Sequence, residues 1–270
     1  MKQHLDVRLV LLLGLGVVIV VMTILQIFAP VLQQGLLARS STYGVMQNVP
    51  ARGSTPQLPA TAPVSGSTAS TIQGTLAQDT FQRPDQPFWG TASDGHIWEG
   101  DPVAQAPLFA VHGVRGEIGG GQGALSALLG PPSKSAEVTL SGSVSRFVAT
   151  TVNMGAVLCW RNSNNWYKAY LDGKHLALLV RRKGTSTMLA SVPFIARAGV
   201  SYTLRFRAVD GTLLAKAWRA SGKEPADWML RADDTTLSSG RAGVRVLVQP
   251  QTVVHVQSFL LRRVDTISAP

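Results

Sequence analysis

Apolar and polar positions alternate over short runs along the second half of the chain, and turn signals separate the runs. Asp172-Gly173 and Asp210-Gly211 each lie between two alternating runs, which is a strong signal for a β-hairpin. No segment here has the pattern of a long amphipathic helix, so the region is typical of a β-sandwich or barrel. Strands are predicted at residues 144–152, 155–161, 165–171, 174–182, 185–194, 200–209, 212–220, 242–249 and 252–264.

Alternation within two runs predicts which side chains face the core, because successive side chains of a strand point to opposite faces. In the run 202–208 the apolar side chains alternate with Thr203, Arg205 and Arg207. In the run 166–171 the side chains of Tyr167, Ala169 and Leu171 share the apolar face. We expect the apolar sets to form the core and one mixed outer face to carry Trp166, Lys168, Tyr170, Arg205 and Arg207.

The apolar run at residues 9–28 carries no charge. At about 1.5 Å per residue it spans roughly 30 Å, the thickness of a bilayer core, and it predicts a transmembrane helix. Lys2 and Arg8 precede it, and the next basic residue is Arg39. The positive-inside rule then places residues 1–8 in the cytoplasm and the rest outside the cell membrane. A cleaved signal peptide is the alternative, although its apolar part is normally shorter.

Residues 29–78 are predicted to form a flexible stalk. Their main part, 40–76, is rich in Ser, Thr, Pro, Gly and Ala, and such a segment buries too little apolar surface to offset its chain entropy. The outer domain is expected at 79–265, with a tail at 266–270, and it is expected to be a monomer. Cys159 is the single cysteine, so no intrachain disulfide can form, and its apolar neighbours indicate a buried small side chain.

Four stretches resemble a family of bacterial extracytoplasmic domains of the concanavalin A-like lectin/glucanase superfamily: "DTFQRPDQPFWGTASDGHIW" (79–98), "CWRNSNNWYKAYLDGKHLALLVRRKGTSTMLASVPF" (159–194), "YTLRFRAVDGTLLAKAW" (202–218) and "SGRAGVRVLV" (239–248). The resemblance covers most of residues 79–264. It implies a laminin-G-like jelly-roll sandwich, a fold that carries lectins, hydrolases and spacer modules alike.

The resemblance also implies roles for the aromatic residues of the first stretch. Phe81, Trp89 and Trp98 are expected to close one end of the sandwich by packing, with an exposed sugar platform as the alternative. Rim loops around Trp98 and Asn164 are where lectin-like relatives commonly hold neutral sugars.

The sequence has few residue patterns typical of catalysis or metal binding. Glycan cleavage needs two carboxylates facing the scissile bond, and no strand carries such a pair, so no catalytic residue and no enzyme is predicted. Calcium needs six to eight oxygens; Asp79, Asp94 and Asp101 would supply some of them, for a structural ion only. No calcium loop of the form DxDxDG is present, so no cofactor is predicted and structural calcium stays the alternative; no histidine pair has the spacing of zinc ligands.

The net charge of the chain bears on its possible binding partners. The chain has 25 Lys and Arg against 15 Asp and Glu, a formal net charge of +10. Two interpretations stay open: a solvated outer face, or a surface that attracts acidic envelope polymers, anionic glycans or lipid headgroups. Nucleic acid fits the charge but not the expected compartment.

Three functions follow from these observations. The first is a membrane-anchored module that binds a glycan or an envelope polymer without catalysis. The second is a glycan hydrolase or lyase with an unrecognised site, and the third is a structural or protein-interaction domain.

Overall fold

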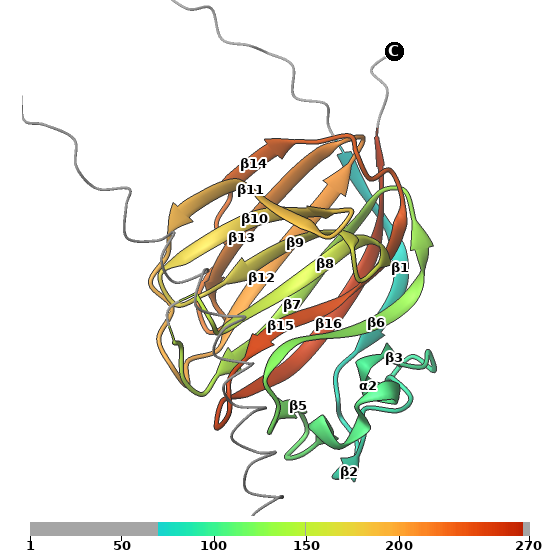
Figure 1. The fold of residues 1–270 in the computed structure, drawn as a ribbon. Helices are drawn as coiled ribbons and strands as arrows, with labels where there is room; N and C mark the ends of the chain where they lie inside the picture. Colours follow the sequence, from blue (N-terminus) through green and yellow to red (C-terminus); the bar gives the residue numbers. More distant parts are fainter. Residues whose placement is uncertain (1–69, 149, 267–270) are drawn as a thin grey trace, which may run out of the picture. The chain divides into compact units, whose positions relative to one another are not determined.

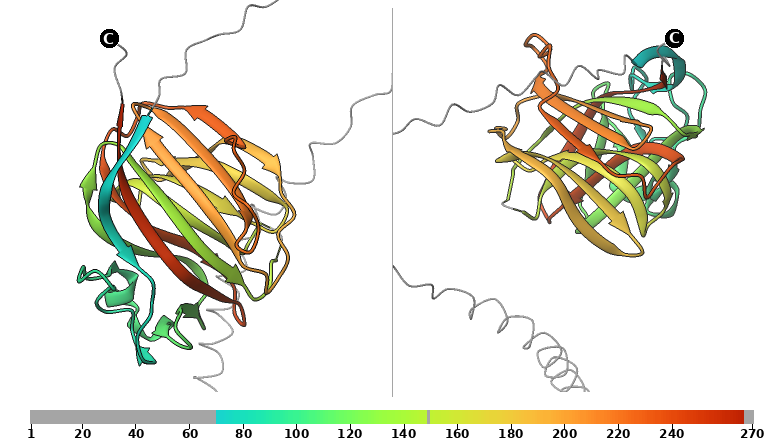
Figure 2. Two further views of the ribbon diagram at one scale, coloured as in Figure 1. Left: turned by 180° about the vertical axis from the view of Figure 1, so that it is seen from behind. Right: turned by 90° about the horizontal axis from the view of Figure 1, so that it is seen from above.

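Two β-sheets pack face to face in the computed structural model, which describes residues 70–148 and 150–266. Figure 1 shows the seven-stranded sheet in front of the nine-stranded sheet, and Figure 2 shows the same two layers from behind and from above. The predicted all-β sandwich is confirmed for these residues.

The nine-stranded sheet has the order β14-β13-β12-β7-β16-β5-β4-β2, and β1 pairs with β16 beside this path. Its strands are β1 (Ser70–Asp79), β2 (Gln86–Pro87), β4 (Phe109–Val111), β5 (Gly116–Gly119), β7 (Ala136–Val144), β12 (Tyr202–Val209), β13 (Thr212–Arg219), β14 (Leu230–Asp233) and β16 (Val253–Thr266).

The seven-stranded sheet has the order β11-β10-β9-β8-β15-β6-β3. Its strands are β3 (Glu99–Gly100), β6 (Gly123–Ser133), β8 (Asn153–Asn162), β9 (Asn165–Leu171), β10 (His175–Arg182), β11 (Thr185–Pro193) and β15 (Gly240–Val248). The short helices α2 (Asp101–Ala104) and η1 (Ala106–Leu108) connect β3 to β4.

The core lies between the two sheets, where the predicted alternation is confirmed. One face of β12 and one face of β9 are buried in the same apolar cluster: Tyr202, Leu204, Phe206, Ala208, Tyr167, Ala169 and Leu171. Each of these residues is at most 5% exposed. The residues between them in sequence therefore face outward.

The structure differs from the predicted elements at several places, and strands β1 to β7 and β14 were not among the predicted strands. Strand β1 begins at Ser70, within the predicted stalk, and pairs antiparallel with β16 from Ser70↔Thr266 to Asp79↔Phe259. The predicted strand at 144–152 is wrong, since β7 ends at Val144 and β8 begins at Asn153. A turn interrupts the run: the Val148 carbonyl accepts hydrogen bonds from the amides of residues 151 and 152.

The predicted membrane span at 9–28 and most of the predicted stalk lie outside the described residues. Within 70–148 and 150–266, no helix is long and apolar enough to cross a membrane.

Candidate functional site

The structure divides the predicted mixed face between the two sheets. Trp166, Lys168 and Tyr170 lie on β9 of the seven-stranded sheet, whereas Arg205 and Arg207 lie on β12 of the nine-stranded sheet. All five are on outer faces, but the outer faces of two stacked sheets point in opposite directions. The prediction of one continuous face is therefore wrong: alternation fixes the face of a strand and not the sheet that it joins.

On the nine-stranded sheet, the outward cations form ion pairs with carboxylates. Glu137 of β7 lies opposite Arg207 of β12, and its side chain is fully buried. Arg207 Nη2 lies 2.7 Å from Glu137 Oε2, and Arg205 Nε lies 3.6 Å from Glu137 Oε1. A second carboxylate, that of Glu224, lies 2.8 Å from Arg205 Nη1 and 2.7 Å from Lys216 Nζ. We call this set the ion-paired face: Glu137, Arg205, Arg207, Lys216 and Glu224.

Aromatic rings extend the ion-paired face. The Trp228 ring lies 5.1 Å from the Arg207 guanidinium and 5.0 Å from Lys216 Nζ. The Arg205 guanidinium lies 5.9 Å from the Trp218 ring. The protein itself thus satisfies the charges of Arg205 and Arg207, and this geometry gives no support to the ligand-binding role predicted for them.

On the seven-stranded sheet, aromatic and basic side chains gather, and no described carboxylate lies within ion-pair distance of Lys168 or Arg245, although Asp101 is near enough to oppose the lowering of the Arg245 pKa. The Trp160 and Trp166 rings are nearly parallel, 7° apart, with centroids separated by 6.2 Å. The Arg245 guanidinium lies 4.7 Å from the Trp166 centroid and 5.5 Å from that of Trp160. The guanidinium thus lies over both indoles at cation–π distance. We call this set the aromatic–cationic face: Trp160, Trp166, Lys168, Tyr170 and Arg245.

A β-bulge in β8 aims Trp160 at this face. The pairing of β8 shifts register at residues 158–162, and Cys159 has a positive φ of 52°. Leu158 and Cys159 consequently both join the core, whereas Trp160 packs against the outer cluster. Strict alternation would turn Trp160 inward, so the extra residue re-aims it. Gly240 fits this bulge because a Cβ there would lie 2.4 Å from the Cys159 carbonyl carbon.

Lys168 is 6% exposed, although it lies on an outer face. Its ammonium donates to Asn153 Oδ1 at 2.5 Å and lies 5.1 Å from the Tyr170 ring centroid. Burial, and then repulsion by Arg245, hold the pKa of Lys168 well below its ordinary value of 10.5. A buried lysine without a carboxylate partner is a costly arrangement in a folded protein.

Arg245 is likewise a partly buried cation without a carboxylate partner in the described structure. Its Nη1 donates to the Ser126 hydroxyl on β6. Burial lowers the pKa of Arg245 to about 10, repulsion by Arg181 adds to this, and Asp101 opposes it. Arg181 of β10 donates to the Ser186 hydroxyl at 3.0 Å. Across residues 70–148 and 150–266, none of Lys168, Arg181 and Arg245 has a carboxylate oxygen within the 4.0 Å of an ion pair.

Asn164 lies in the exposed turn between β8 and β9, next to this face. The backbone N–H of Asn164 donates to Asn162 Oδ1 at 3.0 Å, and Trp166 Nε1 donates to the Ser163 carbonyl at 3.0 Å. The turn thus holds the Trp166 indole, and the Asn164 side chain stands at the rim.

Trp98 lies in the core and not at a binding surface, since it is 1% exposed. Its ring packs edge-to-face on Trp89 at 4.7 Å, and its Nε1 donates to Asp79 Oδ2 at 2.7 Å. Asp79 is fully buried and also pairs with Arg83 at 2.8 Å. The segment 85–101 therefore closes one end of the sandwich, as the packing interpretation predicts.

The three carboxylates proposed for calcium bind protein donors. Asp79 has the contacts given above, Asp94 Oδ2 accepts from the Gln78 amide at 2.6 Å, and Asp101 Oδ2 accepts from the Ser126 amide at 2.6 Å. No group of three or more His, Cys, Asp or Glu side chains in the described part of the chain is arranged to hold a metal ion.

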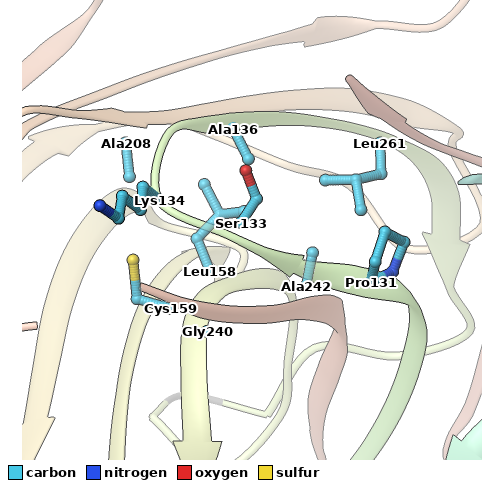
Figure 3. Close-up of a pocket in the computed structure, with 10 residues that line it drawn as sticks. All are labelled: Pro131, Ser133, Lys134, Ala136, Leu158, Cys159, Ala208, Gly240, Ala242 and Leu261. Atoms are coloured by element: carbon cyan, nitrogen blue, oxygen red, sulfur yellow. The ribbon is translucent and has the colours of Figure 1, made fainter. Parts of the chain in front are cut away.

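The cavities lie away from the aromatic–cationic face. The gap in Figure 3, lined by Cys159, Lys134 and eight other residues between the sheets, has about 220 Å³ but no room for a water molecule. Burial also raises the pKa of the Cys159 thiol to about 11, so its thiolate is scarce at neutral pH. A shallow groove along β2, β4 and β5 contains His112, whose Nδ1 lies 2.6 Å from Asp85 Oδ2, and Glu117, 3.5 Å from His255. Both histidines already have carboxylate partners.

Sequence reasoning missed Trp160 and Arg245. The alternation in "GVRVLV" does place Arg245 opposite the buried Val244 and Val246, which was an available signal. The bulge that re-aims Trp160 has no such signal, and neither does the pairing of β15 with β8.

Comparison with known proteins bears on the fold. No family model and no curated protein sequence matches the chain. Xylan beta-1,4-xylosidase from Bacillus halodurans C-125 superposes with a TM-score of 0.53 and 13% identity, over 69% of this chain and 39% of that one. The GH43 protein BlXynB from Bacillus licheniformis gives 0.51 and 12%, over 69% and 39%. The carbohydrate-binding module CBM66 from Bacillus subtilis gives 0.42 and 12%, over 67% and 92%.

The chain thus spans about two fifths of the length of the two enzymes. At these identities the likeness concerns the fold alone. Together with the order of the two sheets, it shows that residues 70–148 and 150–266 form a two-sheet β-sandwich whose fold resembles part of these enzymes.

Proposed function

We propose that the outer domain binds a glycan on the aromatic–cationic face and does not cleave it. One observation carries the proposal: the partly exposed rings of Trp160 and Tyr170 lie on the outer side of a sheet with the buried Trp166 indole packed against Trp160, beside cations that have no carboxylate partner in the described structure. Aromatic rings offer flat apolar surfaces for the C–H faces of sugars, and basic groups donate hydrogen bonds to sugar oxygens.

Residue placement supports this face over the others. Trp160 and Tyr170 are each partly exposed, and Asn164 at the adjoining turn adds amide donors and acceptors. The fold resembles part of a xylan beta-1,4-xylosidase, an enzyme named for a polysaccharide, but that likeness leaves the ligand to be argued from the residues.

We also propose that residues 9–28 anchor the protein in the cell membrane, with the sandwich outside. The support is the uncharged apolar run and the basic residues before it. Protease added to intact cells is expected to remove the sandwich, and full protection of the C-terminus would reverse the orientation.

Binding is tested with the full chain in a neutral detergent against a panel of neutral and acidic polysaccharides. Trp160→Ala is expected to weaken binding about tenfold or more, as loss of a central aromatic anchor does. Trp218→Ala is the matched control, because Trp218 is also partly exposed but lies on the outer face of the other sheet.

Two outcomes would contradict the proposal. Equal affinity of both variants and wild type for every polysaccharide would favour the structural or protein-interaction function. New reducing ends after incubation with a polysaccharide would show hydrolysis in place of simple binding.

A further inference from the structure

We infer that the aromatic–cationic face contains a subsite for the carboxylate of a uronic acid, with Arg245 as its main ligand and Lys168 and Arg181 as supporting cations. The inference rests on the proposed function and names the class of glycan. It is carried by the convergence of three unpaired cations with an aromatic ring.

The cations come from three strands of one sheet: Lys168 from β9, Arg181 from β10 and Arg245 from β15. Within the described residues their hydrogen-bonding side-chain partners are neutral: Asn153, Ser186 and Ser126. Mutual repulsion and burial both disfavour this cluster in the absence of an anion. The ion-paired face shows that the same fold supplies carboxylates where cations serve the fold alone.

Arg245 retains donors for a ligand. A guanidinium has five N–H donors, and one described acceptor, the Ser126 hydroxyl, takes one of them. The cation–π contacts with the two indoles and the hydrogen bond to Ser126 hold its planar fork in place. A preorganised fork of this kind suits the two oxygens of a carboxylate.

Gly155 leaves room for the Lys168 side chain on the aromatic–cationic face. It lies opposite Tyr170 on one side and Arg245 on the other. A Cβ on Gly155 would lie 2.7 Å from Lys168 Cε, so the absence of a side chain lets the lysine stem cross from β9 to Asn153 on β8. Without Gly155, the ammonium would lose this path toward Arg245.

The spacing favours a uronic acid over other anionic glycans. The Arg245 guanidinium is 5.5 Å from the centroid of the Trp160 ring. A uronate carries its carboxylate directly on the pyranose ring, so one sugar residue can stack on Trp160 while its carboxylate meets Arg245. A phosphate in a polymer backbone lies between residues and has no such fixed relation to a ring face.

Three uronate polymers test the inference: polygalacturonate, alginate and hyaluronan, each compared with its own carboxyl-reduced, neutral form. Polyphosphate serves as an anion without sugar. The full chain in neutral detergent is expected to bind at least one native polymer roughly ten to a hundred times more tightly than its reduced form. Arg245→Gln is expected to abolish that ratio, and Arg245→Lys to restore it in part.

Arg146→Gln is the control, since it removes the same charge from an exposed loop residue. It is expected to leave the ratio of native to reduced affinity unchanged. If Arg245→Gln does not fold, Arg245→Lys and Arg181→Gln carry the test, each with an expected drop in the ratio.

The outcomes separate the subsite from the proposed function. Equal binding of native and reduced polymers, with dependence on Trp160, would overturn the subsite and leave glycan binding in place. Polyphosphate bound as tightly as the uronates, without dependence on Trp160, would leave an anion site and overturn glycan binding. An unchanged ratio in every Arg245 variant would overturn the inference, and failure of wild type to bind any polymer would contradict both proposals.

Discussion

The two outer faces of the sandwich carry the same kinds of side chain but satisfy their charges in different ways. On the ion-paired face, Glu137 and Glu224 lie within 2.7–3.6 Å of three cations. On the aromatic–cationic face, the described partners of Lys168 and Arg245 are an amide and a hydroxyl. We therefore use the partners of a basic residue, and not its outward position, to separate charges that serve the fold from charges that we propose to serve a ligand.

The first prediction concerns a substitution that removes a carboxylate from the ion-paired face. Glu137→Gln leaves Arg207 and Arg205 without their buried carboxylate, and breaking such a pair from one side costs about 3–5 kcal/mol. Glu117→Gln is the control, because its carboxylate is partly exposed and lies 3.5 Å from His255; it should cost about 1 kcal/mol or less. Urea denaturation measures both, and similar costs for the two variants would contradict a structural role for the ion-paired face.

The second prediction compares two indoles. Trp98→Ala removes a ring that is 1% exposed, at an expected cost of about 3–5 kcal/mol in the free energy of unfolding. Trp160→Ala removes a partly exposed ring, so its cost in stability should be smaller, while its effect on glycan affinity should be larger. A larger stability cost for Trp160 would place that ring in the core in solution.

The third prediction targets the bulge. Gly240→Ala puts a methyl group into contact with the backbone of Cys159 and Trp160, and overpacking of this kind costs about 1–3 kcal/mol. Because the bulge aims Trp160, glycan affinity should fall as well. Gly74→Ala has no atom within 4 Å of the added methyl and should change neither quantity. Retained affinity in Gly240→Ala would separate the bulge from the binding face.

The fourth prediction concerns Lys168. Lys168→Met replaces a buried, unpaired ammonium with an apolar chain of similar length and should stabilise the domain at pH 7 by about 1 kcal/mol or more. In wild type, the unfolded chain binds the proton more tightly than the folded one, because the folded pKa of Lys168 is the lower one. Stability contributed by this group therefore rises with pH, from the lowered pKa up to 10.5.

Melting curves between pH 7 and pH 10 test whether the stability of wild type rises with pH relative to Lys168→Met. The difference in stability between Lys168→Met and wild type should shrink as the pH rises. A constant difference would show that folding does not lower the pKa of Lys168, and a variant less stable than wild type at pH 7 would show that the ammonium is stabilised in the free protein.

Local signals were enough to predict half of the described strands, namely β8 to β13, β15 and β16. Asp172-Gly173 and Asp210-Gly211 are hairpin turns in the structure, and β9 has the predicted bounds. Strand β1 was not predicted, because the small and polar residues in "STIQGTLAQD" have no strand pattern of their own. Its place is fixed by pairing with β16 at the far end of the chain, which no local window contains.

The candidate site could be predicted only in part for the same reason. Alternation correctly turned Trp166, Lys168 and Tyr170 outward, because it is a property of one strand. Arg245 reaches them through the pairing of β15 with β8, and Arg205 leaves them because β12 joins the other sheet. Both depend on tertiary pairing, and the direction of Trp160 depends on a single extra residue in β8.

The most direct test of the account measures two properties of two arginine variants. For Arg207→Gln and Arg245→Gln, the free energy of unfolding and the affinity for a bound polysaccharide are determined in the same preparation. We expect Arg207→Gln to lose stability and keep its affinity, and Arg245→Gln to lose affinity and keep most of its stability. The opposite pattern, or equal losses of both properties in the two variants, would contradict the division of the cations between fold and ligand.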